Sequence, residues 1–161
     1  MTATVRHARP ADLPRVVRLI AEHAAFERAD PPAPDLAQRL DALLFGTPEP
    51  RLRCLVAESA EHGIVGYASC EPALSTWQGR AYLHMDCLYL SADARGGGIG
   101  RLLVAAVAAE ARALGLDEIQ WQTPTWNKDA ARFYDRLGAH AKEKLRYSLA
   151  AEVSPAADRA P

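Results

Sequence analysis

A glycine-rich turn between an apolar segment and an alanine-rich one is the feature that most limits how this chain can fold. The turn reads Arg95-Gly-Gly-Gly-Ile-Gly100. The nearly continuous apolar run 82–90 before it predicts a strand buried on both faces, and the segment 98–114 after it predicts a helix that Gly115 ends. Glycines let backbone N–H groups at a helix start approach an anion. The turn therefore predicts phosphate or pyrophosphate binding; the alternative is a glycine turn without a ligand.

The spacing of the glycines excludes two common phosphate motifs. A dinucleotide fingerprint needs G-x-G-x-x-G, and counting from Gly96 or Gly98 the final position holds Arg101 or Leu103. A P-loop needs Gly-Lys-Ser/Thr, which occurs nowhere in the chain. Arg95 and Arg101 are expected to add charge-assisted hydrogen bonds to the anion.

The other segments predict a mixed α+β sheet with helices on both faces. Apolar alternation indicates strands over 4–8, 52–58, 64–70, 82–90, 118–123 and 144–149, and helical periodicity indicates helices over 12–26, 35–44, 98–114 and 127–137. We expect a single domain over residues 1–150, because 161 residues suit one domain. The small and polar residues 151–161 predict a flexible C-terminal tail.

Composition limits the partners and the compartment. The formal net charge is −1, so we expect no nucleic-acid partner. No apolar run approaches the ~18 residues that span a bilayer, so we expect no membrane partner. Cys54, Cys70 and Cys87 show no CxxC spacing and lie in apolar runs, which indicates buried thiols in a cytoplasmic protein. We expect no metal ion.

Two motifs resemble the GNAT family of N-acetyltransferases. Arg95-x-x-Gly98-x-Gly100 matches the family's acetyl-CoA signature, and Asn127-x-x-Ala-x-x-Phe-Tyr134-x-x-x-Gly-Ala matches its second motif. The resemblance implies the GNAT fold, with six to seven strands and a splay between the fourth and fifth, and acetyl-CoA as acyl donor. It also implies a set of cofactor-binding residues, which are Leu88, Leu90, Arg95, Gly96, Gly97, Gly98, Ile99, Gly100, Arg101, Asn127 and Tyr134.

The same resemblance implies two catalytic residues. Tyr134 would protonate the thiolate that leaves, and Asp86 would take the proton of the amine, directly or through water. Asp86 lies in an otherwise apolar strand, so it is expected to be buried with a raised pKa; the alternative is a structural carboxylate. His84 shares the strand parity of Asp86 and is either a proton relay or a structural histidine. Cys87 is expected on the opposite face, as a poor nucleophile.

Two further stretches resemble the diamine N-acetyltransferases, which act on spermidine/spermine or thialysine. In segment 19–27, Glu27 would bind a distal ammonium group; in segment 75–80, Trp77 would line the substrate channel. The alternatives are a solvated glutamate and an anchoring loop aromatic.

The expected function is therefore acetyl transfer from acetyl-CoA to a primary amine of a small molecule, diamine/polyamine-like or amino-acid-like, in a ternary complex. The alternatives are a non-catalytic acyl-CoA-binding module and an acetyltransferase for a peptide or aminoglycoside amine. By resemblance we expect a homodimer.

Overall fold

The computed structural model describes residues 2–151, which form two compact units divided between Asn127 and Lys128. The first unit contains five strands, three α-helices and two short 3-10 helices, Pro10–Asp12 and Ala92–Ala94. The strands are β1 Ala3–His7, β2 Arg53–Ser59, β3 Gly63–Ser75, β4 Arg80–Leu90 and β5 Ile119–Gln120. The α-helices are α1 Leu13–Phe26, α2 Leu36–Phe45 and α3 Ile99–Ala113. Among the described residues, no helix has both the length and the apolarity needed to cross a membrane.

The five strands form one mixed sheet in the order β1-β2-β3-β4-β5. Neighbouring strands among β1 to β4 are antiparallel to one another, whereas β5 is parallel to β4 because α3 crosses over between them. Pairing between β4 and β5 is limited to Leu83 with Ile119 and His84 with Gln120. The predicted mixed α+β fold is confirmed, and β4 separates from β5 after His84.

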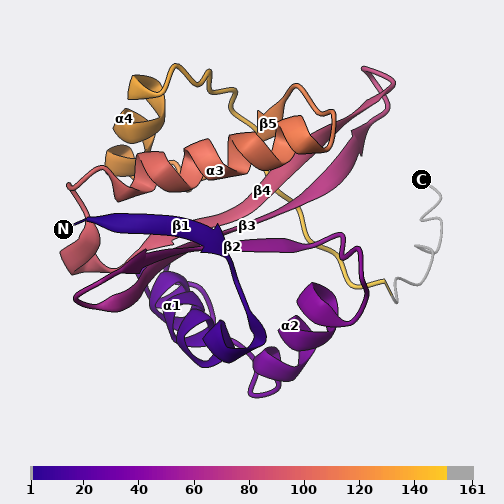
Figure 1. The fold of residues 1–161 in the computed structure, drawn as a ribbon. Coiled ribbons are helices and arrows are strands. Elements are labelled where there is room, and N and C mark those ends of the chain that lie inside the picture. Colours follow the sequence, from indigo (N-terminus) through magenta and orange to yellow (C-terminus); the bar gives the residue numbers. More distant parts are fainter. Residues whose placement is uncertain (1, 152–161) are drawn as a thin grey trace, which may run out of the picture. The chain divides into compact units, whose positions relative to one another are not determined.

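Helices cover both faces of the sheet, as the sequence predicts (Figure 1). On one face of the sheet, one side of α3 packs against the strands, and its residues Ile99, Leu103 and Val107 are buried there. On the other face α1 and α2 form a second core. Val16 and Leu19 of α1, three residues apart and therefore on one side of the helix, are almost completely buried there.

A β-bulge in β4 decides which side chains face which core. Met85 pairs with Cys70 and Cys87 pairs with Ser69, so Asp86 has no partner residue in β3. Strand alternation is therefore interrupted once. The side chains of Leu83, Met85, Leu88 and Leu90 pack in the core under α3, whereas those of Cys87 and Tyr89 pack in the core under α1.

The second unit contains helix α4, Lys128–Arg136, which begins directly after Asn127. Gly138, with φ +83°, follows its end, as expected of a C-terminal glycine. The prediction of a strand over 144–149 is wrong, since no residue from 137 to 151 is in a strand. The expected six to seven strands are therefore five within the described residues. Apart from Ala151, the predicted tail lies outside them.

Candidate active site

The glycine turn has the backbone geometry of an anion site. Gly96 and Gly98 both have φ +82°, and Gly98 is the N-cap residue of α3. A Cβ atom added at either glycine would meet nothing within 4 Å, so these glycines are needed for conformation and the space above them is open. No side chain caps the helix start. The first N–H groups of α3, those of Ile99 and Gly100, have no partner within the helix and lie at its positive dipole end, next to the open space at Gly96 and Gly98.

The edge of β4 beside this turn presents backbone groups of Leu88 and Leu90. The N–H of Ser91 donates to the carbonyl of Val65 over 2.9 Å, which makes these two residues a hydrogen-bonded antiparallel pair. Such pairs recur at every second residue, so Tyr89 also bonds to β3, whereas the backbone groups of Leu88 and Leu90 point away from β3. They lie beyond the two-residue pairing with β5. The carbonyl of Leu90 accepts a hydrogen bond from Arg95 Nε over 3.1 Å.

Arg95 lies on an aromatic surface. Its guanidinium carbon is 4.7 Å from the ring centroid of Phe26 and 5.4 Å from that of Tyr89. These cation–π contacts hold Arg95 beside the strand edge and the glycine turn. Arg101 is exposed in the first turn of α3.

Asp86 is exposed, so the expectation of a buried carboxylate is wrong. The exposed fraction of its side chain is 57%. The cause is the β-bulge, which leaves Asp86 unpaired. His84 Nε2 lies 3.8 Å from Asp86 Oδ1, so the two side chains share a face of the strand, at ion-pair distance when the imidazole is protonated.

Cys87 lies next to Asp86, which corrects the expectation that it would be on the opposite face. Its Sγ is 3.5 Å from Asp86 Oδ2, because the bulge breaks the alternation between these two residues. Burial raises the pKa of the Cys87 thiol to about 11. Only a small fraction of the Cys87 side chain is therefore a thiolate at neutral pH. Cys87 is a poor nucleophile for this reason, as expected.

The end of α1 brings a second carboxylate and a histidine to this face. Glu27, the residue after α1, is about one-third exposed. His23 Nε2 lies 3.3 Å from Glu27 Oε1, and His23 Nδ1 lies 3.1 Å from the hydroxyl of Tyr67. The His23 ring also stacks on Tyr89, with centroids 5.0 Å apart.

Trp77 lies far along the sheet from Asp86 and Glu27, and two other predicted residues belong to the segment around α4. Trp77 is 94% exposed in the turn between β3 and β4. That turn is separated from Asp86 by the first six residues of β4, roughly 20 Å at 3.3 Å per residue. Asn127 immediately precedes α4, and Tyr134 lies within α4 in the second unit, where its ring centroid is 5.2 Å from that of Phe133.

Sequence reasoning missed a cluster of aromatic side chains, formed by Phe26, Tyr89 and Trp126. It also missed His23, which stacks on Tyr89. Phe26 contacts Trp126 with ring centroids 5.8 Å apart, and the guanidinium of Arg28 is 5.1 Å from the Trp126 ring. Arg28 is the only non-glycine residue of the described chain with positive φ. The only sequence signal for His23 is its position four residues before Glu27, which places both on one side of a helix.

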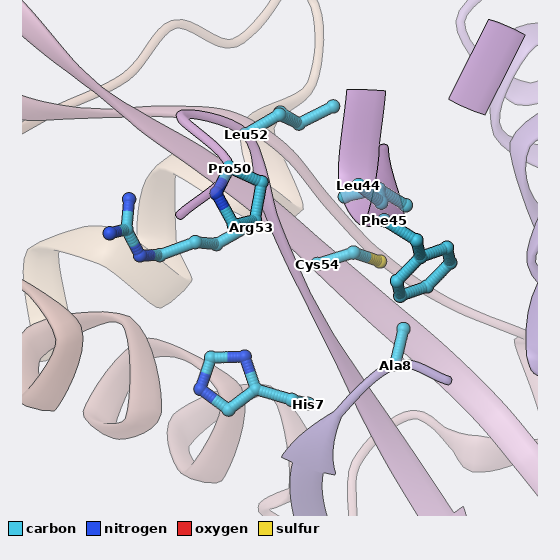
Figure 2. A pocket seen from close by; sticks show the side chains of 8 residues that line it. All are labelled: His7, Ala8, Leu44, Phe45, Pro50, Leu52, Arg53 and Cys54. Atoms are coloured by element: carbon cyan, nitrogen blue, oxygen red, sulfur yellow. The ribbon is translucent and has the colours of Figure 1, made fainter. Parts of the chain in front are cut away.

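A small pocket lies elsewhere on the first unit (Figure 2). Its cavity volume is about 50 Å³, and β1, α2 and β2 contribute lining side chains such as His7, Leu44 and Cys54. None of the predicted site residues lines it. Burial raises the pKa of Cys54 to about 12, so this thiol is also unreactive.

The chain is similar to known proteins in sequence and in fold. The acetyltransferase (GNAT) family model matches residues 15–139. The thialysine N-epsilon-acetyltransferase of Mus musculus is 33% identical over 142 residues, covering 84% of this chain and 82% of that protein. The protein of the same name from Caenorhabditis elegans is 30% identical over 145 residues, covering 85% and 79%. A solved structure, the transcriptional regulator from Bacillus halodurans C-125, has a TM-score of 0.76 at 28% identity and covers 92% of this chain and 100% of that chain.

The family match spans most of the chain and includes both the glycine turn and α4. The similarity to the thialysine acetyltransferases extends over a comparable length. The chain therefore belongs to the GNAT acetyltransferase family and is an N-acetyltransferase that acts on amines.

Proposed function

We propose that this N-acetyltransferase uses acetyl-CoA to acetylate a primary amine of a small molecule that carries a second cationic group, a diamine or a diamino acid. The proposal that acetyl-CoA is the acyl donor rests on one observation. The glycine turn at the start of α3 lies next to a strand edge whose Leu88 and Leu90 backbone groups point away from β3.

The residues present fit acetyl-CoA. The open space at Gly96 and Gly98 suits a pyrophosphate, and Arg95 and Arg101 supply positive charge beside it. The N–H groups of Leu88 and Leu90 and the side chain of Asn127 would hold the amide-containing arm. When bound, acetyl-CoA supplies an acetyl group activated as a thioester.

Two side chains would move protons. Asp86 would accept the proton that the attacking amine gives up, at a carboxylate oxygen or through a water molecule, with His84 beside it. Tyr134 would donate its hydroxyl proton to the sulfur as the C–S bond breaks and the C–N bond forms. The raised pKa of Cys87 argues against an acyl-cysteine route.

The acceptor class is proposed from Glu27 and from the relatives. Glu27 is a partly exposed carboxylate on the same face of the sheet as Asp86, so it can hold a second ammonium group while the first reacts. Relatives are named for thialysine and, at lower identity, for L-ornithine, both amino acids with a side-chain amine. Trp77 would reach such an acceptor only from another copy of the chain or after movement of its hairpin. Leu74 and Trp77 are exposed together on that hairpin, which supports a homodimer as part of the proposal. The free thiols of Cys54, Cys70 and Cys87 support a cytoplasmic location as part of it.

The test is thiol release from acetyl-CoA with thialysine, ornithine, α,ω-diamines, an aminoglycoside and a peptide amine. Release with thialysine or a diamine, and little with the peptide and the aminoglycoside, is the expected result. Tight acetyl-CoA binding without release from any amine would instead indicate a non-catalytic acyl-CoA-binding module.

A further inference from the structure

Helix α1 ends with an arginine in a backbone conformation that favours glycine. The N–H of Ala29 donates to the carbonyl of Ala24 over 2.9 Å, and the N–H of Arg28 donates to the carbonyl of Ala25 over 3.2 Å. These two hydrogen bonds form a Schellman motif, in which the residue at the position of Arg28 has a left-handed backbone. Arg28 accordingly has φ +58°.

Two other helices of the chain end in the same hydrogen-bond pattern, with a glycine at this position. Gly115 follows α3 with φ +70°, and Gly138 follows α4 with φ +83°. Glycine adopts this conformation without strain, whereas the Cβ atom of an arginine makes the conformation unfavourable. A strained non-glycine residue at a candidate site indicates a function for its side chain.

The Arg28 side chain lies at the candidate active site. Its guanidinium carbon is 5.1 Å from the ring centroid of Trp126, and the Trp126 ring contacts that of Phe26. Phe26 is also the ring over which Arg95 lies, beside the glycine turn. Arg28 is exposed, so its side chain is not needed to fill the core. A cation–π contact uses the charge of the guanidinium and leaves its N–H groups for a hydrogen-bond acceptor.

Glu27 and Arg28 place opposite charges next to each other at the end of α1. Within residues 2–151 they form no ion pair with each other, since Glu27 contacts His23 and Arg28 contacts Trp126. The head of an α-amino acid carries an ammonium and a carboxylate on one carbon, so it is complementary to these two side chains. A diamine has no carboxylate, so its second ammonium would lie near the positive charge of Arg28, which is unfavourable.

We infer that Arg28 binds the α-carboxylate of the acceptor while Glu27 binds its α-ammonium, so that the enzyme selects a diamino acid over a simple diamine. The inference rests on the proposed function, in which Glu27 holds the amine that does not react. A guanidinium suits this task because its N–H groups can bind both oxygens of a carboxylate.

Ornithine and 1,4-diaminobutane provide a matched pair of acceptors. They carry two amines at the same spacing along the chain and differ only in the carboxylate. With the full protein and acetyl-CoA, wild type is expected to have a higher kcat/KM for ornithine than for 1,4-diaminobutane. In Arg28→Gly and in Arg28→Asn, the ratio of the two kcat/KM values is expected to fall roughly tenfold, the effect of losing a hydrogen bond to a charged group.

Both variants suit the backbone at this position, because glycine and asparagine tolerate a left-handed conformation. Thermal unfolding of the two variants checks that they are folded. A wild-type ratio in either variant would overturn the inference, as would a wild-type enzyme that does not prefer ornithine. Weaker binding of acetyl-CoA with an unchanged ratio would assign Arg28 to the cofactor and would also overturn it.

A binding measurement separates this inference from the proposed function. Ornithine is titrated calorimetrically into the wild-type and Arg28→Gly proteins in the presence of CoA, which carries no acetyl group to transfer. If neither amine is acetylated, the proposed function fails, and this titration still tests the carboxylate site. A roughly tenfold higher Kd for ornithine in Arg28→Gly supports the site. Equal Kd values in the two proteins, or no binding of ornithine to wild type, would rule it out.

Discussion

Tyr134 carries the clearest prediction at the scale of one residue. If its hydroxyl protonates the leaving sulfur, Tyr134→Phe lowers kcat by ~10²–10⁴ while the Kd for acetyl-CoA stays within about twofold of wild type. Thiol release and calorimetric titration measure the two quantities. Tyr147→Phe is the matched control, because Tyr147 is an exposed tyrosine with no proposed role. Equal kcat values for wild type and Tyr134→Phe would remove the role of general acid.

Asp12 carries a prediction on stability. It accepts hydrogen bonds from Nη1 and Nη2 of Arg6 and from the backbone N–H of Arg9. The hydrogen bond with the Arg6 side chain holds the pKa of Asp12 below its ordinary value of 3.8. A carboxylate whose folded-state pKa is depressed stabilises the fold above its unfolded pKa, and this contribution is lost as the pH falls through the folded pKa.

Asp12→Asn is therefore expected to lower the free energy of unfolding by about 2 kcal/mol at pH 6, and by progressively less below about pH 4. Urea unfolding at several pH values measures the difference. Asp117→Asn is the control, since Asp117 forms an exposed ion pair with Arg80 and is expected to change stability by less than about 0.5 kcal/mol. A pH-independent difference for Asp12→Asn would contradict the assignment.

At the scale of the elements, β3 and β4 approach each other closely at Gly66. A Cβ atom there would lie 2.7 Å from the carbonyl oxygen of Tyr89 and in conflict with the Leu90 side chain. Gly66→Ala is therefore expected to destabilise the protein by about 1–3 kcal/mol. Gly79→Ala is the comparison, because it has open space and only the strain of φ +63°, about 1 kcal/mol. Equal losses in chemical unfolding would show that the close approach has no energetic effect.

The limits of sequence reasoning also appear at this scale. Glycines predicted the ends of α3 and α4 correctly, since Gly115 and Gly138 both have positive φ. The alternation over 144–149 wrongly predicted a strand, because a strand needs a partner and alternation alone does not supply one. The two-residue β5 is shorter than the predicted strand 118–123 for the same reason.

At the scale of the whole molecule, acetyl-CoA is expected to stabilise the folded protein. Free ligand at a hundred times its Kd raises the free energy of unfolding by about 2.7 kcal/mol, because it binds only the native state. Gly98→Ala should weaken this stabilisation, since φ +82° is strained for alanine and the turn would have to shift. Gly115→Ala places a similar strain, at φ +70°, at the other end of α3 and should leave the ligand-induced stabilisation intact. Thermal unfolding of both variants, with and without acetyl-CoA, measures the stabilisation by the ligand in each. Equal stabilisation in the two variants would argue against this turn as the binding site.

The sequence by itself determined the mixed α+β architecture, the glycine turn and the family motifs. These depend on local properties, namely apolar periodicity, glycine conformation and short spacings, which can be read without knowing any partner residue. Arg95 and Gly98 were predicted as cofactor-binding residues in this way.

Only the tertiary structure decided the surroundings of Asp86. Nothing in the run Met85-Asp86-Cys87 shows which residue is bulged, because the bulge depends on how β4 pairs with β3. The pairing exposes Asp86 and brings Cys87 to its side, and the packing of α1 brings His23 to Tyr67. Such contacts join residues far apart in the chain, and they arise from strand register and packing, which local sequence patterns do not specify.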